Sequence, residues 1–149
     1  MRKSTCLLPL ALGTFGLGMT EFVMMGILPD IAKSMSISIP AAGNFISMYA
    51  LGVVFGSILL VILGRTRPLK QLLIILVSVF TAANLISAFA VNYHIFCALR
   101  FIAGLPHGAF FGVGAIAAGK LCDAGRKNQA VATMVSGMTI ANLFGIYKS

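Results

Sequence analysis

The chain has 149 residues, of which 59% are apolar and only 9% are charged, and its mean hydropathy is +1.01. Water-soluble domains carry about 25% charged residues, so this sequence has too few polar side chains to cover a water-facing surface and is predicted to be a polytopic membrane protein. The net charge of +8 does not indicate nucleic-acid binding, because the Lys and Arg residues stand mostly in short breaks between apolar runs.

Five apolar stretches are long enough to cross a bilayer, which takes a helix of about 20 residues. None of them alternates strictly between apolar and polar residues, so helices are favoured over barrel strands. We therefore predict an all-α membrane protein in which a single domain, residues 1–149, contains five transmembrane helices at about 6–28, 42–63, 70–91, 95–119 and 129–147.

The first stretch follows Arg2 and Lys3, which is also how a secretory signal peptide begins. The apolar run is longer than the core of a signal peptide, and no small-x-small cleavage site follows it. We interpret it as a retained first span that stops at Pro29, with a cleaved signal peptide as the alternative. The second helix is expected to begin at 38–40, where Ser-Ile-Pro supplies a cap and an early proline.

Glu21 is the only acidic residue inside a predicted span. An ionised carboxylate in hydrocarbon costs about 2.5–3.5 kcal/mol on insertion scales, so it is rarely present without a partner or a function. Glu21 is therefore a candidate functional residue. The alternative is a structural carboxyl group that is protonated or hydrogen-bonded among the helices.

The number of Lys and Arg residues alternates between high and low from one break to the next along the chain. The break after the second span contains Arg65, Arg67 and Lys70, the break after the third contains no Lys or Arg, and the break after the fourth again contains three basic residues. By the positive-inside rule, this pattern places the N-terminus and the loops at 64–70 and 120–128 in the cytoplasm. The C-terminus is then predicted to lie outside.

Glycines recur at a spacing of four residues in the second and fourth predicted spans. Small residues at that spacing let two helices approach closely in lipid, where packing has to replace the hydrophobic effect. We interpret these glycines as helix–helix contacts and not as ligand contacts: Gly52, Gly56, Gly104, Gly108 and Gly112.

Arg100 is a second charge inside a predicted span, about six residues from the outer end of the fourth helix, or roughly 9 Å deep at 1.5 Å per residue. Glu21 lies roughly 10 Å deep by the same measure. Each charge would be uncompensated without the other, so the first and fourth spans are predicted to face each other or to line one cavity. The alternative is that the Arg100 side chain extends along its helix to the outer interface.

His107 lies two helical turns after Arg100 on the same helix face. Imidazole titrates in a range that suits a proton relay, and this is one interpretation of His107. The other is a hydrogen-bonded packing residue.

The sequence contains no nucleophile–base constellation, no phosphate-binding loop and no metal cluster, and its three cysteines are too scattered for a zinc site. We therefore expect neither an enzyme nor a protein with a bound cofactor. Solute movement needs only a cavity, a few polar groups and a titratable coupling residue. The expected partners are the lipid bilayer and a small-molecule solute.

The first predicted helix contains the run LALGTFGLGMTEFVMMGILPDIA (10–32). This run resembles the first helix of major facilitator superfamily proton-coupled efflux permeases, in particular of the sugar-efflux branch often called arabinose efflux permeases. Three further segments resemble the second-helix entry, the arginine-based fourth-helix motif and the start of the fifth helix of that family: SIPAAG (38–43), RFIAGLPHGAFFGVGAI (100–116) and VSGMTIANLFG (135–145). The resemblance covers nearly the whole chain.

The resemblance implies a proton-driven antiporter of the bacterial inner membrane that exports sugars or small drug-like molecules, with the proton gradient as its energy source. In that family the first and fourth helices line the central cavity. Glu21 would then serve in proton coupling or substrate binding, and Arg100 would be its charge partner and a relay arginine.

Two features depart from the family. In the loop after the second helix, Arg65 replaces an aspartate and two glycines are lost. The chain also stops at the fifth helix, so it would be a partial N-terminal half, and major facilitators bind substrate between two halves. We expect the free chain to be inactive, or active with a complementary half. The alternative is a non-transporting truncated product, or an assembly or regulatory partner of a full-length permease.

Overall fold

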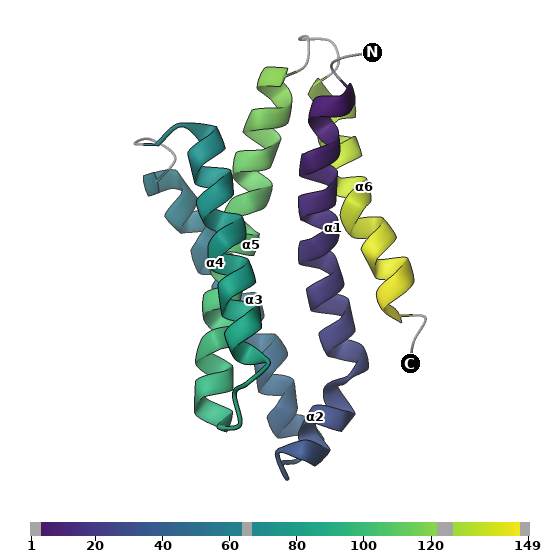
Figure 1. The fold of residues 1–149 in the computed structure, drawn as a ribbon, viewed down its shortest axis with the longest axis vertical. Coiled ribbons are helices and arrows are strands. Elements are labelled where there is room, and N and C mark those ends of the chain that lie inside the picture. The colour runs from purple at the N-terminus through teal and green to yellow at the C-terminus, as the bar shows by residue number, and fades with distance from the viewer. Residues whose placement is uncertain (1–3, 64–66, 122–126, 147–149) are drawn as a thin grey trace. The chain divides into compact units, whose positions relative to one another are not determined.

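The computed structural model describes residues 4–63, 67–121 and 127–146, and these residues form helices and no strand (Figure 1). Four helices contain apolar stretches long enough to cross a membrane, and a fifth contains the shorter apolar stretch Val131–Leu143. The all-helical prediction is confirmed, and four of the five predicted spans are confirmed by length and composition. The described helices are α1 (Ser4–Gly26), α2 (Leu28–Ser34), α3 (Ile39–Leu63), α4 (Leu69–Ser87), α5 (Tyr93–Leu121) and α6 (Lys127–Ile146).

The sequence predicts that the first helix stops at Pro29, but the structure differs. α1 ends earlier, at Gly26, and Pro29 lies in the first turn of the short helix α2. Proline is tolerated there because the first N–H groups of a helix have no partner within the helix. The prediction that Pro29 stops the first span was therefore wrong: this proline begins a new helix.

Ser38 caps α3, as predicted. Its Oγ accepts a hydrogen bond from the backbone N–H of Ala41 at 3.3 Å, and its carbonyl accepts one from Ala42 at 3.0 Å. The first bond satisfies a donor that the first turn of a helix leaves unpaired, and the second is the first bond of the helix ladder. Pro40 falls in that same turn, where its missing N–H costs nothing.

The chain divides into two compact units, which are described separately. The first unit comprises Met1–Gly26 and Phe111–Ser149, and so contains α1, α6 and the end of α5. The second unit comprises Ile27–Phe110, and so contains α2, α3, α4 and the greater part of α5.

In the first unit, α1 and α6 lie side by side (Figure 1). A Cβ added to Gly137 of α6 would overlap the carbonyl of Ala11 in α1. Close by, the buried Thr14 hydroxyl donates a hydrogen bond to the Met134 carbonyl at 2.5 Å. Small residues and an interhelical hydrogen bond are the contacts expected between helices in lipid.

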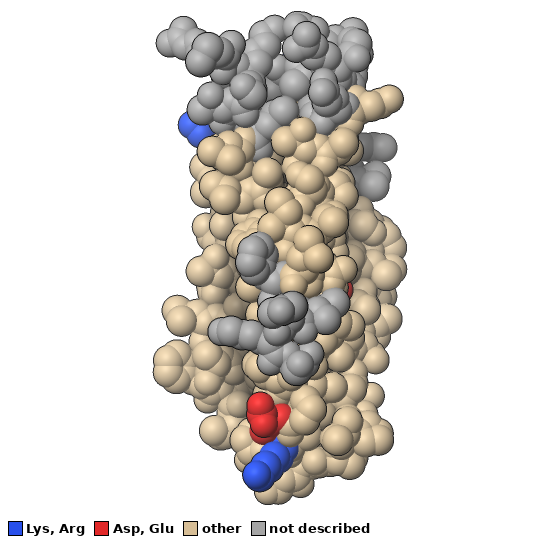
Figure 2. Space-filling model, turned by 90° about the vertical axis from the view of Figure 1, so that its right-hand side faces the viewer, with Lys and Arg blue, Asp and Glu red and all other residues tan. Residues whose placement is uncertain are grey.

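In the second unit, α4 buries one narrow stripe of residues spaced three or four apart, namely Leu72, Leu76, Phe80, Ala83 and Ser87. Large apolar side chains such as Ile74, Ile75 and Leu85 are exposed on its other sides. On the face of the molecule drawn in Figure 2, few charged residues appear among those described. Exposed apolar surface of this extent is typical of a lipid-facing protein.

Candidate functional site

The site is built on a close crossing of α3 and α5 in the second unit. Gly52 of α3 faces Gly104 of α5, and the Cβ that either lacks would lie 3.0 Å from the Cα of the other. One turn further on, a Cβ on Gly56 would lie 2.8 Å from Leu105 Cα, and a Cβ on Gly108 would overlap the Val53 carbonyl. Only glycine allows the two backbones to come this close.

Gly112 is the fifth glycine of the predicted packing stripe. It lies in the end of α5 that belongs to the first unit. Its packing role stays a prediction.

Tyr49 lies on the same stripe of α3 as the glycines, one turn before Gly52, and it is buried. Its hydroxyl oxygen is 2.6 Å from Nδ1 of His107, which lies in α5 between Gly104 and Gly108. The two rings meet edge to face with their centroids 5.6 Å apart. His107 is thus hydrogen-bonded across the crossing.

Arg100 also contacts Tyr49. Its guanidinium carbon lies 4.3 Å from the centroid of the Tyr49 ring, and its side chain is only 1% exposed. A cation over an aromatic face is attracted by the ring's negative π density, by about 2 kcal/mol or more where both groups are desolvated. Arg100 and His107, which the sequence placed on one face of α5, therefore meet on a single tyrosine of α3.

Tyr49 was missed by the sequence analysis. The signal that could have identified it is its register: it precedes Gly52 and Gly56 by three and seven residues, so it shares their helix face. A tyrosine on a packed face of an apolar helix needs a partner for its hydroxyl. The nearest polar groups on the facing stripe of α5 are Arg100 and His107.

A second tyrosine marks the end of the α3–α5 contact where α5 begins. Tyr93 accepts a hydrogen bond from Asn44 Nδ2 at 2.8 Å and donates one to the Ala41 carbonyl at 3.3 Å. Phe45 packs against the rings of Tyr93 and Phe96, with centroids 5.2 and 4.6 Å away. This aromatic group holds the beginning of α5 against α3.

Glu21 is half-buried in α1. It belongs to the first unit, whereas Arg100 and His107 belong to the second. The predicted pairing of Glu21 with Arg100 would join one unit to the other, so it stays a prediction.

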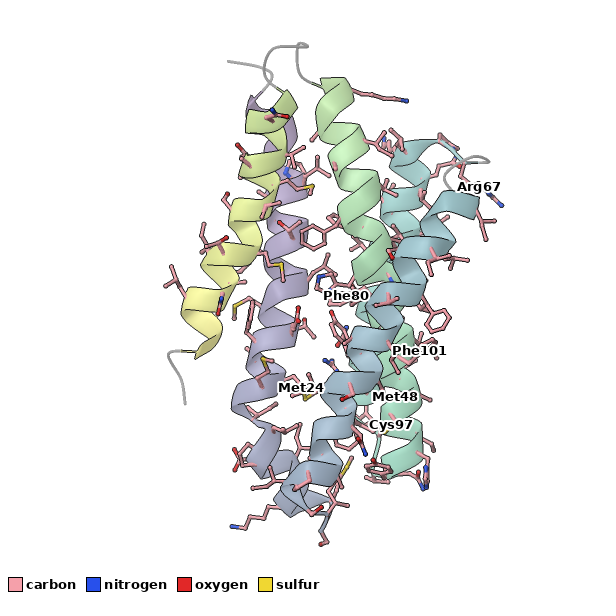
Figure 3. The ribbon with its side chains drawn as sticks, turned by 180° about the vertical axis from the view of Figure 1, so that it is seen from behind. Met24, Met48, Arg67, Phe80, Cys97 and Phe101 are labelled. Atoms are coloured by element: carbon pink, nitrogen blue, oxygen red, sulfur yellow. The ribbon has the colours of Figure 1, made fainter. Side chains whose placement is uncertain are left out.

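The basic residues predicted to mark a cytoplasmic loop lie before and at the start of α4. Arg67 and Lys70 are exposed, and Figure 3 shows the Arg67 side chain pointing away from the helices. Arg65 lies outside the described residues. Exposed basic side chains beside a span fit the positive-inside pattern, and the side on which they lie stays a prediction.

The arrangement in the second unit offers a cation, a phenol and an imidazole within one buried cluster. These groups can hold and move a proton or neutralise a carboxylate. Across the three described segments, no group of three or more His, Cys, Asp or Glu residues lies close enough to hold a metal ion.

Comparison with known proteins gives a family match over most of the chain. The family model described as Major Facilitator Superfamily matches residues 10–147. No solved structure matches the chain.

The chain is also similar to curated transport proteins. It is 49% identical over 140 residues to AraJ of Escherichia coli (strain K12) and 45% identical over 146 residues to "Inner membrane transport protein YdhP" of the same organism, which is 94% and 98% of this chain. A "Chloramphenicol resistance protein" of Streptomyces lividans is 31% identical over 92% of this chain, and a "Probable sugar efflux transporter" of Helicobacter pylori (strain G27) is 30% identical over 91% of it. The chain spans 36% and 38% of the lengths of AraJ and YdhP, and 35% of the other two.

Proposed function

Because this chain belongs to the Major Facilitator Superfamily, whose relatives compared above are transport proteins and not enzymes, we propose that it forms part of a proton-coupled exporter of sugars or small drug-like solutes. The two solute classes are those in the names of the sugar efflux and chloramphenicol resistance relatives. The proton gradient supplies the energy. The bacterial inner membrane is the proposed location, as the name of YdhP states for that relative.

The observation that carries this proposal is the buried cluster of Arg100, His107 and Tyr49 inside a membrane-spanning helix pair. Charged and titratable side chains at such depth are costly, and they mark ion or substrate pathways more often than structural sites. The cluster holds a permanent cation beside a group that can change its protonation state. Proton relays in membrane proteins are built from such groups.

In the proposed mechanism, Glu21 binds and releases the coupled proton. Arg100 is the charge partner that stabilises the ionised carboxylate, and His107 passes a proton along the same path. When Glu21 is protonated, its attraction to Arg100 is lost, so the two protonation states favour different arrangements of the helices that carry them. A solute that binds only one of those arrangements is thereby coupled to the proton.

We further propose that α6 is the fifth span, which puts the C-terminus on the opposite side of the membrane from the N-terminus. α6 has 20 residues, and at 1.5 Å per residue it is about 30 Å long, which matches the hydrocarbon core. With five spans and the basic loops inside, the N-terminus is cytoplasmic and the C-terminus lies outside. A complementary transporter half would complete the substrate site.

A hybrid protein tests the proposal. Residues 1–146 of this chain replace the matching segment of YdhP, and export of a labelled sugar and of chloramphenicol is measured from cells. We expect export by the hybrid, and its loss in the Glu21→Gln variant. The matched control is Asp30→Asn, which also removes one carboxylate but lies in α2, outside the apolar spans.

An inserted hybrid that exports neither solute would contradict the proposal and would favour a non-transporting role. Equal export by the Glu21→Gln variant would refute the coupling role of that residue.

The Glu21–Arg100 pairing has its own test in the amount of chain inserted into membranes. Because each charge is costly without the other, Glu21→Gln together with Arg100→Gln should reduce insertion less than either change alone, and additive defects would refute the pairing.

A further inference from the structure

The geometry points to Tyr49 as a positioning residue that fixes the tautomer of His107 and the place of Arg100 at the same time. Its hydroxyl donates to Nδ1 of His107, so the neutral imidazole carries its proton on Nε2, and its ring face holds the guanidinium of Arg100. The use assigned to this arrangement rests on the proposed proton-coupled transport. The arrangement itself can be tested without transport.

Three contacts support this role. The Tyr49 oxygen lies 2.6 Å from His107 Nδ1, the Arg100 guanidinium carbon lies 4.3 Å from the ring centroid, and all three side chains are at least nine-tenths buried. The backbone of Tyr49 is held as well, because Gly104 of α5 packs directly against its carbonyl. A tyrosine fixed at both ends is pre-organised to orient what it touches.

The direction of the hydrogen bond follows from the chemistry of the phenol. Tyrosine has one O–H proton to donate, and a neutral imidazole has one nitrogen that accepts and one that donates. The Arg100 cation over the ring draws electron density from the π system and therefore from the oxygen. The hydroxyl becomes a stronger donor and a weaker acceptor, so the bond runs from Tyr49 to Nδ1, and the imidazole proton is carried by Nε2.

This arrangement links the protonation of His107 to Tyr49. Nδ1 is the basic nitrogen of the neutral ring, and the hydroxyl of Tyr49 occupies it. When His107 takes up a proton from water at Nδ1, both imidazole nitrogens become donors. The Tyr49 hydroxyl keeps its own proton, and its O–H bond must rotate so that the oxygen accepts the hydrogen bond from Nδ1. The switch of this hydroxyl from donor to acceptor alters the phenol whose ring face holds Arg100. The protonation state of His107 therefore affects the Arg100 guanidinium.

The ring nitrogens of His107 can be observed directly. The chain contains two histidines, His94 and His107, so ¹⁵N-histidine labelling of the full chain in lipid nanodiscs gives two sets of ring signals, which His94→Gln assigns. At a pH where the ring is neutral, we expect the proton on Nε2 and a hydrogen-bonded, unprotonated Nδ1. The Nε2–H form should predominate by roughly tenfold or more, since one hydrogen bond of ordinary net strength adds a factor of that order.

Two substitutions separate the roles of the hydroxyl and the ring. Tyr49→Phe should move the Nδ1 signal downfield, as an imine-type nitrogen does when it loses its donor, while the Arg100 side-chain protons keep their ring-current shift. Tyr49→Leu should abolish both effects. The matched control is Tyr93→Phe, which removes a hydroxyl bonded to Asn44 and Ala41 and should leave the His107 signals unchanged.

A proton on Nδ1 in the unsubstituted chain would overturn the inference, and this result needs no variant to fold. An unchanged Nδ1 signal in folded Tyr49→Phe would overturn it as well. Failure of the proposed function gives a different result, in which the hybrid exporter moves no solute while the His107 signals are as predicted.

Discussion

Replacing Gly56 with alanine tests the α3–α5 crossing on which the candidate site is built. The added Cβ would lie 2.7 Å from the carbonyl carbon and 2.8 Å from the Cα of Leu105, and it would overlap the carbonyl oxygen. All three atoms belong to the backbone of the opposite helix. No side-chain rotation can relieve the overlap, so α3 and α5 must separate.

The expected cost follows from that separation. A gap of 0.5–1 Å forfeits about a quarter to a half of the dispersion energy of each atom pair, which is ~0.1–0.2 kcal/mol at best contact. Overpacking of this kind costs about 1–3 kcal/mol. Alanine returns up to ~1 kcal/mol through its higher helix propensity, so we expect Gly56→Ala to lower the free energy of unfolding by about 1–2 kcal/mol.

Gly43→Ala is the control in the same helix, because a Cβ at Gly43 meets no atom within 4 Å. That substitution should be neutral or stabilise the chain by up to ~1 kcal/mol. Both variants are compared by circular dichroism during unfolding in mixed detergent and dodecyl sulfate micelles. If Gly56→Ala were as stable as Gly43→Ala, α3 and α5 would not cross at these glycines and the reasoning would be refuted.

Three further predictions concern single contacts and the orientation of the chain. Thr14→Val removes a buried hydrogen bond from α1 to α6 and should lower the free energy of unfolding by about 0.6 kcal/mol in the same assay. Thr20→Val loses only a bond within α1 and should change it by nearly nothing. Equal costs would contradict the interhelical role of Thr14. Asn92 caps α5, because its Oδ1 accepts hydrogen bonds from two backbone N–H groups at 2.9 and 3.3 Å. Asn92→Ala should therefore lower the free energy of unfolding by about 1 kcal/mol, and an unchanged unfolding curve would argue against the cap. In an otherwise cysteine-free chain, Val91→Cys should react with an impermeant maleimide in intact cells and Lys70→Cys only after permeabilisation, and the reverse pattern would invert the proposed orientation.

The helices could be predicted from sequence because the signals are strong and local. Long apolar runs and the Ser38 cap each depend on neighbouring residues alone, and the predicted helices agree with the observed ones to within a few residues at most ends. Pro29 misled the prediction because proline is equally compatible with the end of one helix and the first turn of the next. Only the course of the backbone after Gly26 separates these cases.

The candidate site was predicted in part. The misplaced charge of Arg100 and the spacing to His107 could be read from α5 alone, since both depend on one helix. The sequence puts Tyr49 on the helix face of Gly52 and Gly56, but its partners follow only from the crossing that brings α3 against α5. The glycine stripes indicate that such a crossing exists, but their spacing does not say which two helices form it.

The central claim is that solute export is coupled to protons through the buried groups of these helices. The most direct measurement is proton movement in sealed vesicles that contain the YdhP hybrid and an internal pH-sensitive dye, when a gradient of a solute that the hybrid exports is imposed. The account predicts a counter-movement of protons that stops in the Glu21→Gln variant and persists in Asp30→Asn. Solute movement without any pH change, or a pH change that survives Glu21→Gln, would contradict it.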